Sequence, residues 1–210
     1  MGRHMSQASK AGWLKTLHTW HWISSAICLI GMLLFALTGI TLNHASWIEV
    51  NPKIVSKKAQ LSPAQLAVLK PAADEKDHHA PVPPETRAAL AQAFGTSIRA
   101  DSAEWSADEI YLPMPRPGGD SWVRVDRESG AAEFEDTDRG WVAYFNDLHK
   151  GRNAGLAWSL FLDVFAVACL LFSITGLLIL KFHAAQRAMT WPLVGLGFVL
   201  PALLALILIH

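Results

Sequence analysis

Five histidines lie at the ends of two long apolar stretches. The first stretch covers residues 17–44 and the second covers residues 148–183. One imidazole from each of two helices is the ligand set of a six-coordinate, bis-histidine haem iron, which is suited to electron transfer and leaves no open position for oxygen. The sequence therefore predicts a haem site at each end of the two stretches. The candidate axial ligands are His18, His21, His44, His149 and His183.

The two stretches repeat one pattern. Each begins with Leu-His, continues through an apolar run with the motif Leu-Leu-Phe-x-x-Thr-Gly, and closes with His. Such an internal repeat predicts two similar helices. If the first helix crosses a membrane outward, the second must cross back, so the copies are antiparallel. We therefore expect His18 or His21 to lie level with His183, and His44 to lie level with His149.

Other interpretations of these histidines stay open. Each of them could be an interfacial side chain that tolerates a wet, polar depth. Two histidines on different helices could also hold zinc, but the sequence offers no further His, Cys or carboxylate at ligand spacing to complete a tetrahedral site. The choice between His18 and His21 is open as well, because they lie three residues apart on nearly the same helix face. Haem is the interpretation that accounts for all five positions.

Asp163 is the one carboxylate inside an apolar run. An ionisable group at this depth costs free energy and is usually functional. It could hydrogen-bond a ligating imidazole or a haem propionate, or carry a proton that balances the electron. The alternative is an acid near a helix end that water reaches. We expect Asp163 to belong to the cofactor site.

Three apolar runs are long enough to cross a bilayer. A helix rises about 1.5 Å per residue, so about 20 residues cover the hydrocarbon core. The first two runs lie within the repeat, and the third covers residues 191–210, where a membrane helix can accommodate Pro201 as a kink. The chain has 210 residues and is 51% hydrophobic, with its apolar residues concentrated in these runs. This pattern predicts a membrane α-helical protein with three spans.

Charge is distributed unevenly along the sequence. Every Asp and Glu except Asp163 lies between Glu49 and Asp147, whereas the flank before the first run and the link after the second carry only basic charges. By the positive-inside rule both basic segments are cytoplasmic. The segment after the first run is then outside, which is the periplasm if the source is a Gram-negative bacterium. We expect the chain in the bacterial inner membrane with its N-terminus in the cytoplasm.

The segment between the first two runs has the composition of a small soluble α+β domain. Serine before proline is typical of a helix start, and glycine of a helix end. Alternating β-branched and aromatic residues around a Pro-Gly-Gly turn predict strands. His78 and His79 fall in a polar, proline-rich loop and are expected to be solvated. The expected elements are helices opened by Ser62 and over 85–94, a loop over 70–84, and strands over 110–112, over 122–126 and through Phe134.

These patterns give the expected order of segments along the chain. Residues 1–5 resemble an expression-vector remnant and carry no prediction. The segments are a cytoplasmic tail (1–16), a first transmembrane helix (17–44), a periplasmic domain (45–139), an interfacial helix and elbow (140–153), a second transmembrane helix (154–182), a cytoplasmic loop (183–190) and a third transmembrane helix (191–210).

Four short motifs stand at the ends of the two long runs. They are Leu17-His18-x-Trp20-His21, Thr38-Gly39 with Leu42-Asn43-His44, Leu148-His149-Lys150-Gly151, and Leu162-Asp163 with Thr175-Gly176. With these motifs the chain resembles the PepSY-associated transmembrane family, in the form of its short three-span members. The turn from Val125-Asp126 to Gly130 is similar to the strand-turn-strand of a PepSY domain. The resemblance thus implies a PepSY-like domain outside the membrane.

Members of that wider family include inner-membrane, haem b-containing ferric-siderophore reductases. The resemblance therefore implies a relay with two haem b groups per chain. It would pass electrons from the quinone pool, or from a cytoplasmic or membrane reductant, to a ferric iron complex in the periplasm. PepSY modules are otherwise associated with propeptides that inhibit peptidases, so the alternative is a membrane-anchored regulatory module that binds a peptidase or another exported partner without redox activity. A homodimer would help three helices to enclose two macrocycles, and no nucleic-acid partner is expected.

Overall fold

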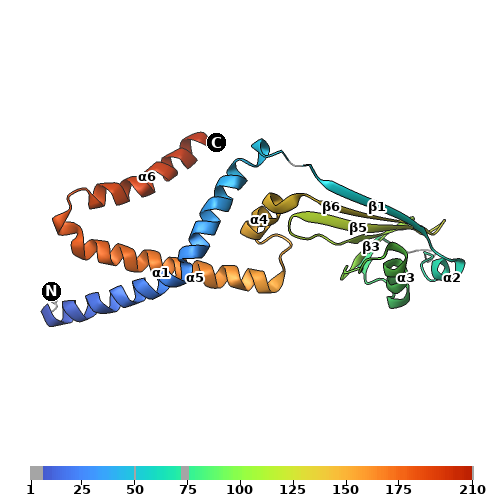
Figure 1. The fold of residues 1–210 in the computed structure, drawn as a ribbon, viewed down its shortest axis with the longest axis horizontal. Coiled ribbons are helices and arrows are strands. Elements are labelled where there is room, and N and C mark those ends of the chain that lie inside the picture. Colours follow the sequence, from blue (N-terminus) through green and yellow to red (C-terminus); the bar gives the residue numbers. More distant parts are fainter. Residues whose placement is uncertain (1–6, 50, 72–75, 210) are drawn as a thin grey trace. The chain divides into compact units, whose positions relative to one another are not determined.

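The structure, a computed structural model, describes residues 7–49, 51–71 and 76–209 (Figure 1). It divides into two compact units, which are treated separately below. The helical unit comprises Met1–Leu34 and Leu160–His210, and the domain unit comprises Phe35–Ser159. The expected vector remnant at residues 1–5 lies outside the described residues.

Three helices are long and apolar enough to cross a membrane. They are α1 (Gln7–Asn43), α5 (Gly155–His183) and α6 (Thr190–Leu208). Almost none of the side chains in their most apolar windows is buried by protein. Apolar surface on this scale requires lipid or a partner helix around it. The expectation of three spans is therefore confirmed at the level of length and composition.

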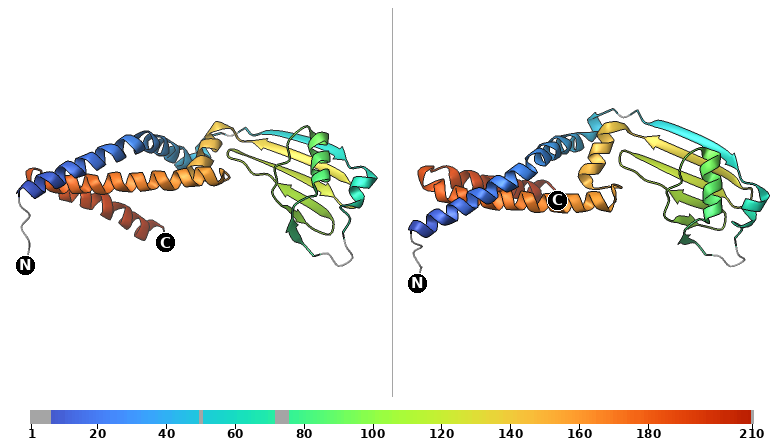
Figure 2. Two further views of the ribbon diagram at one scale, coloured as in Figure 1. Left: turned by 90° about the horizontal axis from the view of Figure 1, so that it is seen from below. Right: turned by 60° about the horizontal axis from the view of Figure 1, so that its bottom comes forward.

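In the helical unit, α1 packs antiparallel to α5 (Figures 1 and 2). As the residue number rises on α1, the partner number falls on α5, because His18 faces His183 and Gly31 meets the Phe165 ring. The α1 seam is spaced by four and three residues, the pattern of helices that cross at a shallow angle. Small side chains keep the helices close, since a Cβ on Gly31 would lie 2.3 Å from Phe165 Cε2. The α1 seam contains Leu17, His21, Ser24, Cys28 and Gly31.

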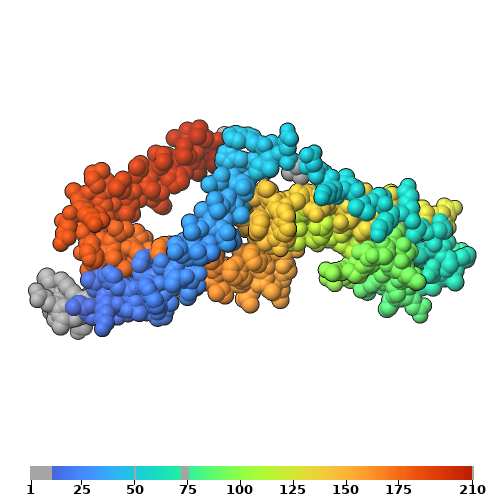
Figure 3. Space-filling model, viewed as in Figure 1, coloured from blue at the N-terminus to red at the C-terminus, as the bar shows by residue number. Residues whose placement is uncertain are grey.

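Helix α6 follows α5 through the 3₁₀ turn η2 (Ala184–Gln186). It has no buried residue, and its side chains are open on the face drawn in Figure 3. Pro201 lies inside the helix, where it removes one backbone hydrogen-bond donor. An apolar helix without internal partners is stable in lipid because its backbone groups, apart from those at its ends and at Pro201, bond within the helix.

The domain unit contains a six-stranded antiparallel sheet in the order β1-β6-β5-β4-β3-β2. Its first strand pairs with its last along the whole length, from Lys53↔Asp138 to Gln60↔Ala131. The strands are β1 (Lys53–Gln60), β2 (His78–Ala80), β3 (Ala103–Trp105), β4 (Glu109–Pro113), β5 (Gly119–Asp126) and β6 (Ala131–Asp138). The other elements are η1 (Ala45–Trp47), α2 (Pro63–Ala67), α3 (Pro84–Phe94) and α4 (Gly140–Lys150).

Helix α3 covers part of one face of the sheet (Figure 2). Alternate residues of β5 are buried on that face, as a strand with one covered side requires. From α3, Leu90 and Phe94 enter the core, where the Phe94 ring stacks on Phe134 at 5.6 Å. The helix ends at Gly95, whose φ of 62° is the left-handed conformation that favours glycine.

The expected strands of the meander are present as β4, β5 and β6, and Ser62 caps α2 together with Gln65. The expectation of an uninterrupted loop over 70–84 is wrong at its end, because His78 and His79 lie in strand β2. This strand has only three residues and is held by tertiary contacts: His78 stacks on Trp105, whose Nε1 donates to the carbonyl of Ala80. A segment stabilised in this way carries no local signal in the sequence.

Candidate functional site

The first group of candidate ligands is the α1–α5 cluster, which consists of His18, His21 and His183. The rings of His18 and His183 have centroids 6.2 Å apart and planes at 86° to each other. His18 lies on α1, and His183 is the last residue of α5. Both side chains are exposed. Of the two pairs expected here, His18 with His183 is the one whose rings face each other.

Hydrogen bonds fix which ring nitrogen carries the proton in both histidines. His18 Nδ1 lies 2.8 Å from the carbonyl oxygen of Leu14, and His183 Nδ1 lies 2.9 Å from that of Ile179. A carbonyl oxygen only accepts, so Nδ1 must donate, and the neutral ring carries its lone pair on Nε2. Metal-ligating histidines are commonly oriented in this way. The arrangement leaves two Nε2 atoms able to coordinate.

His21 is held differently, within the helix seam. Its Nδ1 lies 3.1 Å from Thr175 Oγ1 and its ring stacks on Phe172 at 4.7 Å. The Thr175 hydroxyl donates to the carbonyl of Leu171, so it accepts from His21. Gly176 provides the space, since a Cβ there would come within 3.3 Å of the His21 ring. His21 therefore packs against the Thr-Gly dipeptide of α5.

The second group is the α1–α4 cluster, which consists of His44 and His149. His149 Nδ1 lies 2.6 Å from Thr38 Oγ1, and its ring lies 4.8 Å from that of Phe35. Thr38 donates to the carbonyl of Phe35, so its oxygen accepts from His149. A Cβ on Gly39 would lie 3.8 Å from the His149 ring. A histidine thus packs against a Thr-Gly dipeptide in this unit as well.

His44 makes its contacts within its own segment. Its Nδ1 lies 3.0 Å from the carbonyl oxygen of Ile40, and its ring lies 4.4 Å from Trp47 of η1. Nε2 is again the nitrogen with the lone pair. Between the rings of His44 and His149 the structure gives no hydrogen bond or ring contact, in the part of the chain that it describes. Thr38, which bonds to His149, is six residues before His44 in the chain. Six residues correspond to a rise of about 9 Å along a helix.

Helix α4 is fastened to the sheet by residues that the sequence did not point to. The buried carboxylate of Asp147 accepts from the backbone N–H of Gly118, at 2.9 Å, and pairs with Arg152 Nε at 3.1 Å. A Cβ on Gly118 would lie 2.7 Å from the Tyr144 backbone, so only glycine fits this turn. The only signal in the sequence was the Pro-Gly-Gly turn. These contacts set the position of His149, two residues after Asp147.

The neighbouring residue, Asn146, fastens the same helix to α1. Thr41 Oγ1 donates to Asn146 Oδ1 at 2.7 Å, and the Asn146 side chain is buried. Together with the bond between His149 and Thr38, this gives α4 two polar contacts to α1 on consecutive turns of that helix. The α1–α4 cluster is therefore anchored both to α1 and to the sheet.

Asp163 lies on α5 with an exposed side chain. Within residues 7–49, 51–71 and 76–209 the structure gives it no hydrogen bond or ion pair. In the same part of the chain, no group of three or more His, Cys, Asp or Glu side chains converges as a metal-ion site would require. A haem iron needs only two protein ligands, fewer than such a metal-ion group.

Comparison with known proteins gives a match to a protein family. No curated protein and no solved structure matches the sequence. Residues 12–210 match the family described as "Putative PepSY_TM-like", which covers all three apolar helices and the sheet domain. Because this match extends over nearly the whole sequence, the chain belongs to the PepSY_TM-like family.

Proposed function

We propose that this protein is a haem b-containing electron-transfer protein of the bacterial inner membrane. It would pass electrons from the quinone pool, or from a cytoplasmic or membrane reductant, to a ferric iron complex in the periplasm. One haem would be held by His18 and His183, and the other by His44 and His149. When bound, such haems would supply one-electron chemistry.

The geometry of His18 and His183 carries this proposal. His18 and His183 would hold the haem together, one from each of two long apolar helices. The observed centroid separation is 6.2 Å. Both Nδ1 atoms are bonded to carbonyl oxygens, so both lone pairs are on Nε2. His78, in the sheet domain, also has its Nδ1 bonded to a carbonyl oxygen, so this bond alone does not mark a ligand. What distinguishes His18 and His183 is that their rings face each other from two long apolar helices.

The structure also supports a choice between His18 and His21. The ring of His18 faces that of His183, whereas the ring of His21 stacks on Phe172 in the helix seam. We assign His18 as the axial ligand. His21 would then support the seam next to the haem, where its contact with Thr175 holds α1 and α5 in register.

The second site rests on His149, because its position is fixed by Thr38 and by the anchored helix α4. His44 follows the last residue of α1 and has its Nε2 lone pair available. The chain's part here is to orient the two imidazoles and to shield them with Phe35 and Trp47. Asp163 is proposed as a partner for an imidazole or a propionate, since an exposed carboxylate in a span is costly without such a role.

The exposed apolar helices are consistent with further partners in the membrane. Helix α6 has no contact that buries any of its residues. A second copy of the chain could cover it and help to enclose the haems. With its basic flanks on the cytoplasmic side, the sheet domain would face the periplasm.

The absorption spectrum of the purified protein tests the proposal. The protein is expressed with haem precursor and solubilised in detergent. We expect a Soret band and, after reduction with dithionite, a b-type α band, with the haem released by acid-acetone because the sequence has no Cys-x-x-Cys-His attachment motif. A colourless, folded preparation would contradict the relay and leave the membrane-anchored binding module.

A further inference from the structure

A groove of about 770 Å³ lies on the sheet face that α3 covers only in part. Its floor is formed by residues of β1 and β6 that pair across the strands, such as Lys57 with Phe134 and Val55 with Asp136. Its wall is the segment that follows α3, which includes Arg99. This volume is in the range of sites that hold small molecules.

Three cationic side chains line the groove: Lys57, Arg99 and Arg116. Arg116 is neutralised by Asp136, because its Nη2 donates to both carboxylate oxygens at 3.1 Å. The Lys57 ammonium donates to the carbonyl of Phe94 at the end of α3, which fixes it at the groove edge. Asp101 is the other acid in the lining.

Arg99 is the cation best placed to meet a ligand. Its side chain is exposed, and its Nε donates to Ser97 Oγ at 3.1 Å, which orients the guanidinium. Its two terminal NH₂ groups have no hydrogen-bond partner among the described residues. A guanidinium with both terminal groups available matches a carboxylate in a two-pronged geometry.

The rest of the lining combines apolar and hydroxyl groups. Val55 and Met114 provide apolar surface, and Thr96 and Ser102 provide hydroxyls. The backbone N–H of Arg99 lies 3.3 Å from the Met114 sulfur, which ties the wall to the residue that follows β4. A compact carbon frame bearing several carboxylate oxygens would satisfy both kinds of surface.

We propose that this groove binds a small organic polycarboxylate, with its carboxylate oxygens on Arg99 and Lys57 and its carbon frame against Val55 and Met114. If the protein is a ferric reductase, the natural ligand is the ferric complex of such a polycarboxylate; that identification rests on the proposed function, whereas the preference for a polycarboxylate does not.

Isothermal titration of the full-length, detergent-solubilised protein tests this proposal with two probes, citrate and ferric citrate. We expect both to bind, and Arg99→Glu to weaken both by about tenfold or more, the loss expected for a charge-assisted contact. Arg124→Glu is the matched control, because it changes the net charge equally but lies on the opposite sheet face, next to Glu109. It should leave binding unchanged.

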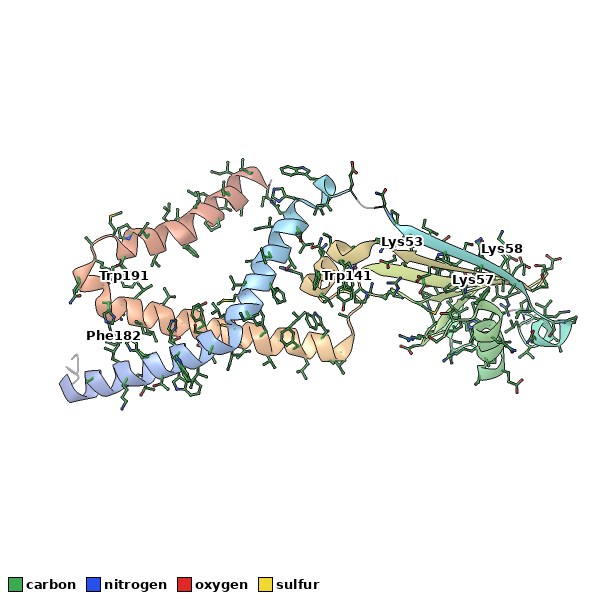
Figure 4. All side chains as sticks on the ribbon, in the orientation of Figure 1. Lys53, Lys57, Lys58, Trp141, Phe182 and Trp191 are labelled. Carbon is green, nitrogen blue, oxygen red and sulfur yellow. The ribbon has the colours of Figure 1, made fainter. Side chains whose placement is uncertain are left out.

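A second pair of variants avoids charge reversal. Lys57 and Lys58 are neighbours on β1 (Figure 4) and point to opposite faces of the sheet. Lys57→Gln should weaken citrate binding, whereas Lys58→Gln should not. Equal effects within either pair, or no binding of citrate, would overturn the groove as a polycarboxylate site.

The outcomes for the groove and for the relay are separable. A haem-loaded protein that binds neither probe overturns the groove and leaves the relay intact. A colourless protein that binds citrate in an Arg99-dependent way supports the groove and overturns the relay. Two results would overturn the ferric polycarboxylate as the ligand. One is that the protein binds citrate but not ferric citrate, and the other is that it binds a positively charged ferric trihydroxamate complex equally well.

Discussion

In each unit a histidine donates its Nδ1 hydrogen to the threonine of a Thr-Gly dipeptide on another helix, His21 to Thr175 and His149 to Thr38. The two clusters differ in what surrounds this contact. In the α1–α5 cluster two further histidines, His18 and His183, face each other, whereas in the α1–α4 cluster His44 contacts Trp47. The comparison shows that the Thr-Gly contact positions a histidine without identifying it as a ligand.

The two clusters differ because different elements carry their histidines. His18 and His183 stand on two long helices whose packing alone sets their separation. His149 stands on a short helix whose place is set by Asp147 and Asn146. The first cluster therefore depends on the packing of two apolar helices, and the second depends on the sheet domain. Under the proposed function the two sites should fail independently.

Removal of one proposed ligand from either cluster should have the largest effect. His183→Ala should remove about half of the haem and leave the other centre with an unchanged spectrum, and His149→Ala should do the converse, because the sites share no ligand. Within the first cluster, His18→Ala should match His183→Ala, whereas His21→Ala should retain the haem. The haem-to-protein ratio of each of these four variants measures the loss. Loss of all haem from either variant, with the fold retained, would contradict two independent sites.

The same substitution in both Thr-Gly dipeptides should have unequal effects. Thr38→Val removes the acceptor that orients His149, a proposed ligand, and should weaken haem binding at that site by about 10-fold to 100-fold. Thr175→Val removes the acceptor of His21 and should leave haem affinity nearly unchanged. Haem titration of the two apo-proteins makes the comparison. A larger effect of Thr175→Val would make His21 the ligand.

Asp147→Ala should act on the α1–α4 cluster alone. It leaves the buried N–H of Gly118 without its acceptor, at a cost of about 1–3 kcal/mol, and releases α4 from the sheet. We expect faster hydrogen exchange over residues 140–150 and lower haem occupancy at the His149 site, with the His183 site unchanged. Arg152→Ala is the control, because it removes only the partly exposed ion pair. Equal loss from both haem sites would break the proposed separation.

Asp126→Ala should have the smallest effect and should reach neither cluster. The hydroxyl and the backbone N–H of Ser129 donate to Asp126 and lower its pKa below the ordinary carboxyl value. A lowered pKa stabilises the fold above the unfolded-state pKa of about 4, and this stabilisation is lost as the pH falls through the lowered value.

The variant should therefore exchange amide hydrogens faster than the wild type at residues 126–131 at neutral pH. In strong acid, where Asp126 is protonated, the equilibrium constant for local opening of this turn should be the same in the variant and in the wild type. Hydrogen exchange followed by mass spectrometry at several pH values checks this. A pH-independent difference would show that the charge of Asp126 has no part in the turn.

The sequence predicted the elements whose signals are local. Long apolar runs predicted the three helices, and serine followed by proline at residues 62 and 63 marked the start of α2. Strand β2 could not be predicted, because it depends on Trp105, which is distant in sequence. The bond between Asp147 and Gly118 joins residues 29 positions apart for the same reason.

For the candidate site, the sequence placed the histidines at the helix ends but could not separate His18 from His21. They lie three residues apart, so periodicity gives both the same face. Their different roles follow from contacts with α5, where Phe172 and Thr175 take up His21. Such contacts depend on the register of two helices that are far apart in the chain, and a hydropathy pattern does not encode that register.

Electron transfer across a sealed membrane tests the central claim most directly. The protein is reconstituted into liposomes with a reductant trapped inside, and ferric citrate together with a colorimetric Fe(II) chelator is added outside. The proposed function predicts that Fe(II) appears outside at a rate proportional to haem content, and that His183→Ala and His149→Ala each abolish it. Haem-loaded wild-type protein that yields no external Fe(II) above protein-free liposomes would contradict it.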